Sequence, residues 1–203
     1  MKIVGVSFSY SKDSMAYRGL TLMDNFLNFE KLIKIDLPMC DSNEPNGVVP
    51  DSVSEFCKSL ELADVIVFSI PEYTAHYSAG FKNAMDWLVV KSNFNATLGK
   101  GYAISNKPVY VITFTPTFKG AGHRHFEMTT HLLEKLGANV VKCFVKNNGW
   151  DNVIPGNFGF VEEEATAILN TTHKPLQVKE EDMTKEVPTW NIDYNNWNKK
   201  WKS

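Results

Sequence analysis

The sequence predicts a three-layer α/β/α domain built on a doubly wound, five-stranded parallel sheet. Short runs rich in β-branched residues alternate with segments of helical periodicity through the first two thirds of the 203-residue chain, which is typical of βαβ units. The third run, Val65–Phe68, is apolar at every position, as a central parallel strand covered on both faces should be. The alternation of five strands with four helices predicts one domain.

Each element follows from a local pattern. Strands are expected at Lys2–Phe8, Lys31–Leu37, Asp64–Ser69, Pro108–Phe114 and Asn139–Val145. A first helix is indicated by a stripe at i, i+4, i+7 and i+11, formed by Ala16, Leu20, Met23 and Leu27. Two more are expected at Ser52–Ala63 and Ala79–Val90, and a fourth carries Phe126, Thr130, Leu133 and Leu136 before a stop at Gly137. The polar segments Pro38–Val49 and Lys91–Asn106 are expected to be loops.

The last part of the chain differs from the rest. After a helix expected at Glu162–Asn170, the sequence becomes polar, so we expect a domain over residues 1–172 and a C-terminal extension over residues 173–203. One face of a short helix is indicated within the extension by Trp190, Tyr194, Trp197 and Trp201. This aromatic helix is expected either to dock on its own domain or to cross onto a partner subunit.

Composition favours small-molecule chemistry. The net charge of −2 is too even for a nucleic-acid binder, and no apolar run reaches the roughly 18 residues of a membrane helix. The chain opens directly into a strand pattern without a signal-peptide pattern, which predicts a cytoplasmic protein. The three cysteines, Cys40, Cys57 and Cys143, have no paired spacing and are expected to be reduced thiols.

The loops after the first, third and fourth strands are the expected ligand site, because ligands of doubly wound sheets bind outside the carboxyl ends of the strands. The first loop brings four polar residues to a helix N-terminus, whose free N–H groups suit a phosphate: Ser9, Ser11, Lys12 and Ser14. The alternative is that Asp13 or Ser14 serves only as an N-cap. Neither a P-loop nor the Gly-x-Gly-x-x-Gly fingerprint is present, which favours a mononucleotide over ATP or a classical dinucleotide site.

A specific resemblance lies in the segment after the third strand. Residues Pro71–Leu88 read Pro-Glu-Tyr-Thr-Ala-His-Tyr-Ser-Ala-Gly-Phe-Lys-Asn-Ala-Met-Asp-Trp-Leu. The segment resembles the NADPH-dependent FMN reductase family, which carries Pro-Glu-Tyr-Asn-Gly-Ser and then Leu-Lys-Asn-Ala-Ile-Asp-Trp-Leu in the same register. The resemblance covers about residues 1–145 and implies a flavodoxin-like fold with strand order 2-1-3-4-5 and bound FMN.

The other two loops match the family in part. Its first loop usually reads Gly-Ser-x-Arg-x-x-Ser-x-Asn, and here Phe8, Ser11 and Ala16 replace the glycine, arginine and asparagine. Lys12 is a possible substitute charge, although it lacks the bidentate fork of arginine. The third loop, Thr115–Gly122, resembles the Gly-rich turn of the family. By resemblance, the remaining flavin contacts are Pro71, Glu72, Tyr73, Thr74, Thr115, Lys119, Gly120 and Gly122.

Other polar residues near these loops have open or structural interpretations. His76 and Tyr77 are bulky where the family has small residues, so either they narrow the flavin site, or His76 is exposed to solvent and Tyr77 packs on the adjacent loop. On the following helix, a structural or interface role is expected for Lys82, Asn83, Asp86 and Trp87. A metal site is not expected from His123, His125 and His131, which have neither a carboxylate partner nor the spacing of a zinc helix.

The resemblance implies an FMN-dependent oxidoreductase that takes hydride from NAD(P)H and reduces a small acceptor. No catalytic side chain is expected, since the flavin itself carries the chemistry. The alternatives are a flavodoxin-like electron carrier without NAD(P)H activity and a flavin-free interaction module of the same fold. A homodimer is also expected.

Overall fold

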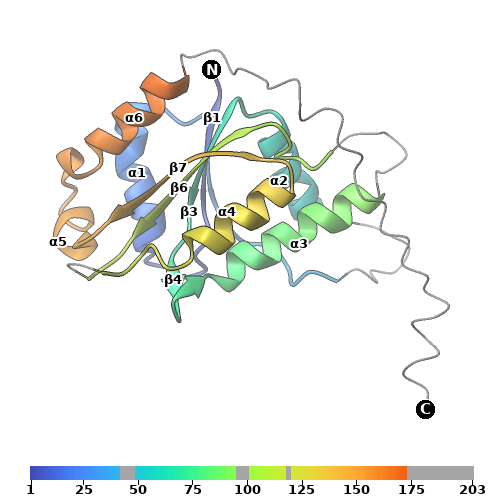
Figure 1. Ribbon diagram of the computed structural model, residues 1–203, viewed down its shortest axis with the longest axis horizontal. Helices are drawn as coiled ribbons and strands as arrows, with labels where there is room; N and C mark the ends of the chain where they lie inside the picture. The colour runs from blue at the N-terminus through green and yellow to red at the C-terminus, as the bar shows by residue number, and fades with distance from the viewer. Residues whose placement is uncertain (42–48, 95–100, 118–119, 173–203) are drawn as a thin grey trace. The chain divides into compact units, whose positions relative to one another are not determined.

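The computed structural model describes residues 1–41, 49–94, 101–117 and 120–172, so the aromatic segment expected within 173–203 lies outside the described residues. Parallel strands form one sheet in the order β2-β1-β3-β6-β7 (Figure 1). These strands are β1 (Ile3–Ser7), β2 (Lys31–Lys34), β3 (Val65–Ser69), β6 (Pro108–Phe114) and β7 (Asn139–Lys146). Because β4 and β5 belong to a separate hairpin, this order confirms the predicted 2-1-3-4-5 topology.

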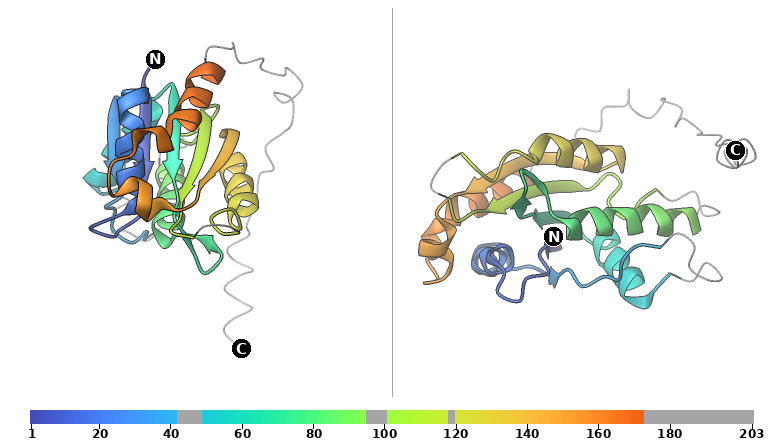
Figure 2. Two further views of the ribbon diagram at one scale, coloured as in Figure 1. Left: turned by 90° about the vertical axis from the view of Figure 1, so that its left-hand side faces the viewer. Right: turned by 90° about the horizontal axis from the view of Figure 1, so that it is seen from below.

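Helices cover both faces of the sheet (Figures 1 and 2). One apolar core lies between the sheet and α2 (Asp51–Glu61), α3 (Ala79–Phe94) and α4 (Phe126–Lys135). The other lies between the sheet and α1 (Met15–Leu27), α5 (Gly149–Val153) and α6 (Glu162–Thr172), with the 3-10 helix η3 (Phe158–Phe160) before α6. This is the predicted three-layer arrangement.

The central strand and the first helix are buried as their sequences predict. In β3, Val65 and Val67 point into the α1 core, whereas Ile66 and Phe68 point into the opposite core. The whole predicted stripe of α1 is buried at 4% exposure or less: Ala16, Leu20, Met23 and Leu27. Alternation along strands and a period of 3.6 along helices explain both patterns.

Two boundaries differ from the prediction by more than two residues. The second strand was expected to reach Leu37, but β2 ends at Lys34. Its chain then bends toward α3, where the Asn83 side-chain amide and the Trp87 indole N–H each donate to the Pro38 carbonyl at 2.8 Å. These hydrogen bonds give Asn83 and Trp87 the structural role expected of them. Helix α3 also runs to Phe94, into the segment expected to be a loop.

The described helices include no membrane-spanning segment, and the three cysteine thiols form no disulfide. Within the described ranges, no helix is both long and apolar enough to cross a bilayer. All three cysteines are free, and burial raises the pKa of the Cys57 thiol to about 12. Cys57 therefore stays protonated, which keeps it unreactive.

Candidate functional site

A cavity of about 540 Å³ lies at the carboxyl ends of β1, β3 and β6. The sheet reverses its winding between β1 and β3, so this is the edge at which a ligand is expected. Predicted contact residues that line the cavity are Ser9, Ser11, Ser14, Pro71, Glu72, Tyr73, Thr74 and Thr115. Its lining does not include Lys12, Gly120, Gly122, His76 or Tyr77, and Lys119 lies outside the described residues.

The loop after β1 presents hydroxyl groups beside the N-terminus of α1. Ser14 is the N-cap, and its hydroxyl accepts a hydrogen bond from the Tyr17 N–H at 3.2 Å. The Ser9 hydroxyl accepts from the Ser11 N–H at 3.3 Å and retains its own proton for donation. Lys12 is exposed, so the predicted substitute charge does not reach the cavity wall in this conformation.

A two-residue hairpin forms the wall after β3, in a segment that was expected to be a loop. Its strands are β4 (Glu72–Tyr73) and β5 (His76–Tyr77), and its turn residues Thr74 and Ala75 have φ values of 49° and 58°. A turn with positive φ at both central positions matches the right-handed twist of the strands and is usually built from Asn-Gly. The hairpin holds Tyr73, which is 55% exposed, at the cavity.

The other strand of the hairpin points away from the cavity lining. Tyr77 packs edge-on against Phe81 with ring centroids 5.2 Å apart, and the Nδ1 atom of His76 accepts from the Tyr77 N–H at 3.0 Å. Of the two interpretations of His76 and Tyr77, this geometry favours packing over narrowing of the site.

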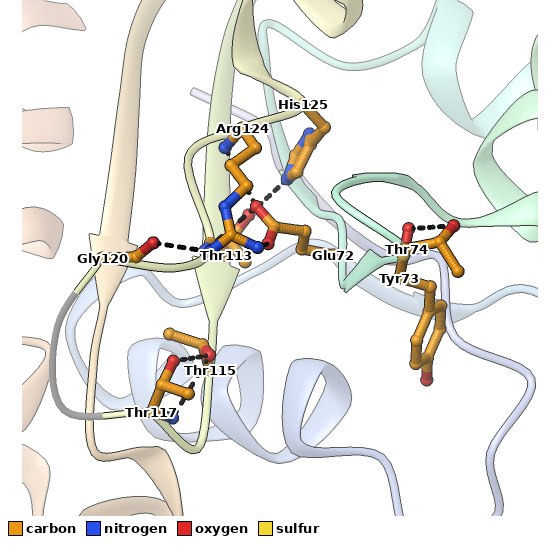
Figure 3. A network of polar contacts seen from close by, with 10 residues as sticks. Glu72, Tyr73, Thr74, Thr113, Thr115, Thr117, Gly120, Arg124 and His125 are labelled. Carbon is orange, nitrogen blue, oxygen red and sulfur yellow. Dashed lines mark hydrogen bonds and ion pairs between the residues drawn. The ribbon is translucent and has the colours of Figure 1, made fainter.

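A buried histidine, His125, is hydrogen-bonded to the end of β6 and to α4, and its bond to Thr113 is drawn in Figure 3. The Thr113 hydroxyl donates to the Ile70 carbonyl at 2.8 Å, so it must accept from the Nε2–H of His125 at 2.9 Å. The other ring nitrogen, Nδ1, then accepts from the Thr129 hydroxyl at 2.9 Å. Burial lowers the pKa of His125 to about 4, against a smaller opposing effect of the Glu72 carboxylate. His125 is therefore a neutral structural residue at neutral pH.

Trp150 and Arg124 are among the lining residues that were not predicted from the sequence. Trp150 comes from α5, which is attached to the loop after β6 by the Gly149 N–H donating to the Thr115 carbonyl at 2.9 Å. A Cβ atom at Gly149 would lie 2.2 Å from the Met15 sulfur and 3.2 Å from the Thr115 carbonyl oxygen, so a larger residue there would require the Met15 side chain to move. Arg124 follows the third loop and also lines the cavity. The available signals were the turn residues before Trp150 and the position of Arg124 after a strand end.

A smaller cavity of about 270 Å³ lies at the opposite end of the sheet, where β1 and β2 begin. It is lined by Lys2, Val4, Glu30, Lys31, Glu55, Lys58, Ser59 and Leu62. The amino ends of parallel strands are not where doubly wound sheets bind ligands, so the larger cavity is the candidate site.

Fold and cavity together define a flavodoxin-like α/β protein with a mononucleotide-sized site at its topological switch point. The chain belongs to the NADPH-dependent FMN reductase family, whose model matches residues 1–151.

Two curated plant proteins share a short segment with this chain. Over 52 residues, the chain is 42% identical to an NADPH:quinone oxidoreductase of Arabidopsis thaliana and 40% identical to an NAD(P)H:quinone oxidoreductase of Solanum tuberosum. Each segment covers 25% of this chain and 26% or 27% of the relative, so the match spans about a quarter of either relative's length.

Solved structures share the fold over most of the chain. The flavoenzyme NAD(P)H:(acceptor) oxidoreductase FerB of Paracoccus denitrificans is 23% identical, with a TM-score of 0.56 over 70% of this chain and 75% of its own. General stress protein 14 of Treponema denticola, solved in complex with FMN, is 12% identical, with a TM-score of 0.55 over 85% of this chain and 99% of its own.

Proposed function

We propose that this protein is an FMN-dependent NAD(P)H oxidoreductase that reduces a small acceptor of the quinone, azo, metal-oxyanion or flavin type. The observation that carries the proposal is the cavity between the loops after β1, β3 and β6 in a chain of the FMN reductase family. Its volume of about 540 Å³ falls within the roughly 300–1,000 Å³ typical of cofactor and small-ligand sites.

The groups after β1 fit a phosphate. Hydroxyls of Ser9 and Ser11 line the cavity together with Met15 and Ala16, which belong to the first turn of α1. Backbone N–H groups of a first helical turn have no acceptor within the helix, and the positive end of the helix dipole favours an anion. These donors would hold the FMN phosphate, as the sequence prediction requires.

The loops after β3 and β6 would hold the ring system. Tyr73, Thr74 and Thr115 line this part of the cavity, and Trp150 adds an aromatic side chain that is 48% exposed. When bound, FMN supplies the chemistry by accepting hydride from NAD(P)H and passing electrons to the acceptor. The residues of this chain bind and orient the reactants, which is the contribution a flavin site requires of a protein.

Titration of the apo-protein with FMN tests the cofactor. We expect quenching of flavin fluorescence with saturation below tens of micromolar FMN, followed by anaerobic bleaching of the bound flavin on addition of NAD(P)H. Absence of any response at tens of micromolar FMN contradicts flavin binding. Flavin that binds but stays oxidised with NAD(P)H contradicts the reductase and favours an electron carrier.

Two substitutions test the phosphate position. Ser9→Ala removes one hydroxyl donor and should raise the Kd for FMN about fivefold, equivalent to roughly 1 kcal/mol. Ser11→Arg restores the arginine of the family motif and should lower the Kd about tenfold through a charge-assisted bond. Riboflavin, which lacks the phosphate, is the control ligand. Equal effects of either substitution on riboflavin and FMN would place the phosphate elsewhere.

We also propose that the protein is a homodimer and that catalysis alternates two half-reactions at one site. Light scattering that returns the 23.0 kDa mass of one chain at micromolar concentration contradicts the dimer. For the kinetics, we expect parallel double-reciprocal plots, because the chain has no fingerprint for a separate dinucleotide site. Intersecting lines contradict the one-site scheme.

A further inference from the structure

The side chain of Glu72 joins the hairpin after β3 to the loop after β6 (Figure 3). One carboxylate oxygen, Oε2, accepts from the Gly122 N–H at 3.0 Å and from the Arg124 N–H at 2.9 Å. The other oxygen, Oε1, pairs with the Arg124 guanidinium at 3.4 Å. Glu72 therefore bonds to the neighbouring loop through its side chain, whereas the family resemblance led us to expect a flavin contact at this position.

These bonds fix the backbone at Gly122 and Arg124, where the third loop ends. The Glu72 side chain is only 8% exposed, and a buried carboxylate is costly unless it is hydrogen-bonded and paired. Gly122 has a φ of 89°, which few other residues tolerate, and this turn directs its N–H toward the carboxylate. The Gly122 N–H is consequently committed to Glu72, so any contact of Gly122 with a flavin would be made by its other atoms.

Arg124 is held by the same group. Its guanidinium donates to the Gly120 carbonyl at 3.0 Å and pairs with Glu72, yet the side chain remains 52% exposed. Among the described residues that line the cavity, Arg124 is the only lysine or arginine. A guanidinium has five N–H donors, and these two contacts leave donors available to a ligand.

We propose that Arg124 is the cationic contact for reduced FMN and that Glu72 is the positioning residue that orients Arg124 and its loop. This inference rests on the proposed function, because it requires FMN in the cavity. Two-electron reduction leaves negative charge on the flavin ring, at its N1–C2=O edge. Arg124 follows the third loop, on the side expected to hold the ring rather than the phosphate. A fixed cation there binds the reduced form more tightly than the oxidised form.

The test compares the two oxidation states. We would measure the Kd for oxidised FMN by titration and the midpoint potential of bound FMN by anaerobic dye equilibration, which together give the Kd for reduced FMN. Arg124→Met should raise the Kd for reduced FMN about tenfold more than that for oxidised FMN, the size of one charge-assisted hydrogen bond. For a two-electron couple, this lowers the potential by about 30 mV. Arg124→Lys, which keeps the charge, should retain more than half of the difference.

Two further variants separate charge from loop structure. Glu72→Gln weakens the contacts that orient Arg124 and hold its loop, so it should raise the Kd for oxidised FMN and lower the potential by less than Arg124→Met does. Arg18→Met is the matched control, because Arg18 pairs with Asp13 at 3.1 Å but does not line the cavity, and it should change neither quantity. Equal weakening of both oxidation states by Arg124→Met, or a larger fall in potential in Glu72→Gln than in Arg124→Met, overturns the inference. Failure of the wild-type protein to bind FMN overturns the proposed function itself.

Discussion

The turn of the β4–β5 hairpin predicts a gain in stability from two substitutions at the edge of the site. Thr74 and Ala75 have φ values of 49° and 58°, in the left-handed region that costs an L-residue about 1–2 kcal/mol. The family motif quoted for this segment has Asn-Gly in the same register, which is the pair that this turn favours. Thr74→Asn and Ala75→Gly should therefore relieve strain that the present sequence retains.

The magnitude follows from the folded and unfolded states together. Thr74→Asn adds little unfolded-state entropy, so we expect a gain of about 1 kcal/mol. Ala75→Gly gains the same strain energy but loses about 0.4–1 kcal/mol through greater freedom of the unfolded chain, which leaves about 0.5 kcal/mol. The double variant should gain about 1.5 kcal/mol, or roughly 3–6 °C in Tm for a domain of this size.

Thermal unfolding of the apo-protein, followed by circular dichroism, measures the effect. Thr166→Asn and Ala167→Gly are matched controls in α6, where the backbone is helical: the first should be nearly neutral and the second destabilising by about 1 kcal/mol. A double variant with unchanged or lower Tm would refute strain in the turn. The Kd for FMN should change less than twofold, since the substitutions preserve the hairpin conformation.

Three further predictions concern His125, Gly19 and Trp150. The pKa of His125 is about 4 in the folded protein and 6.5 in an unperturbed chain, so the unfolded state binds the proton first. The stability that His125 contributes is then complete above pH 6.5 and falls by about 3 kcal/mol toward pH 4, and urea unfolding of His125→Gln should lack this component. If the free energy of unfolding of the wild-type protein and of His125→Gln follows parallel pH profiles, this prediction is contradicted. Gly19→Ala places a Cβ atom 2.4 Å from the Phe114 ring and should lower the free energy of unfolding in urea by about 2–3 kcal/mol. An unchanged urea midpoint would contradict this packing. Trp150→Ala should raise the Kd for FMN about tenfold. Trp150→Phe keeps an aromatic face and should raise the Kd less than threefold. An equal rise in Kd for the two variants would contradict contact between Trp150 and the flavin ring.

The sequence was sufficient for the sheet because each strand and helix has a long, periodic apolar pattern. Val65–Phe68 and the stripe from Ala16 to Leu27 could each be assigned to a buried position from the spacing of their apolar residues. The hairpin was missed for a physical reason: its strands have two residues each, too few to show alternation, and Thr74-Ala75 lacks the Asn-Gly signal of its turn type.

The site was predictable as a location and less so as a set of contacts. Strand ends of a parallel sheet converge, so the loops containing Ser9, Thr74 and Thr115 were correctly brought to one cavity. The direction of a side chain in a loop depends on tertiary hydrogen bonds that no local pattern encodes. Glu72 lines the cavity as expected, but the bonds from its carboxylate to the backbone of the next loop could not be predicted from the sequence.

The charges around the cavity are matched in pairs, and this bears on which molecules can enter. Asp13 is paired with Arg18 in the first loop and helix, and Glu72 is paired with Arg124 across the second and third loops. The Asp13–Arg18 pair leaves no net charge beside the loop after β1, so a phosphate bound there would be held by the hydroxyls and the N-terminus of α1 through hydrogen-bond geometry and the helix dipole. A wall of balanced charge does not repel a neutral planar acceptor, and the exposed rings of Tyr73 and Trp150 give it an apolar surface. Under the proposed one-site scheme, the same balance would allow the cavity to take a charged nicotinamide cofactor and an uncharged oxidant in turn.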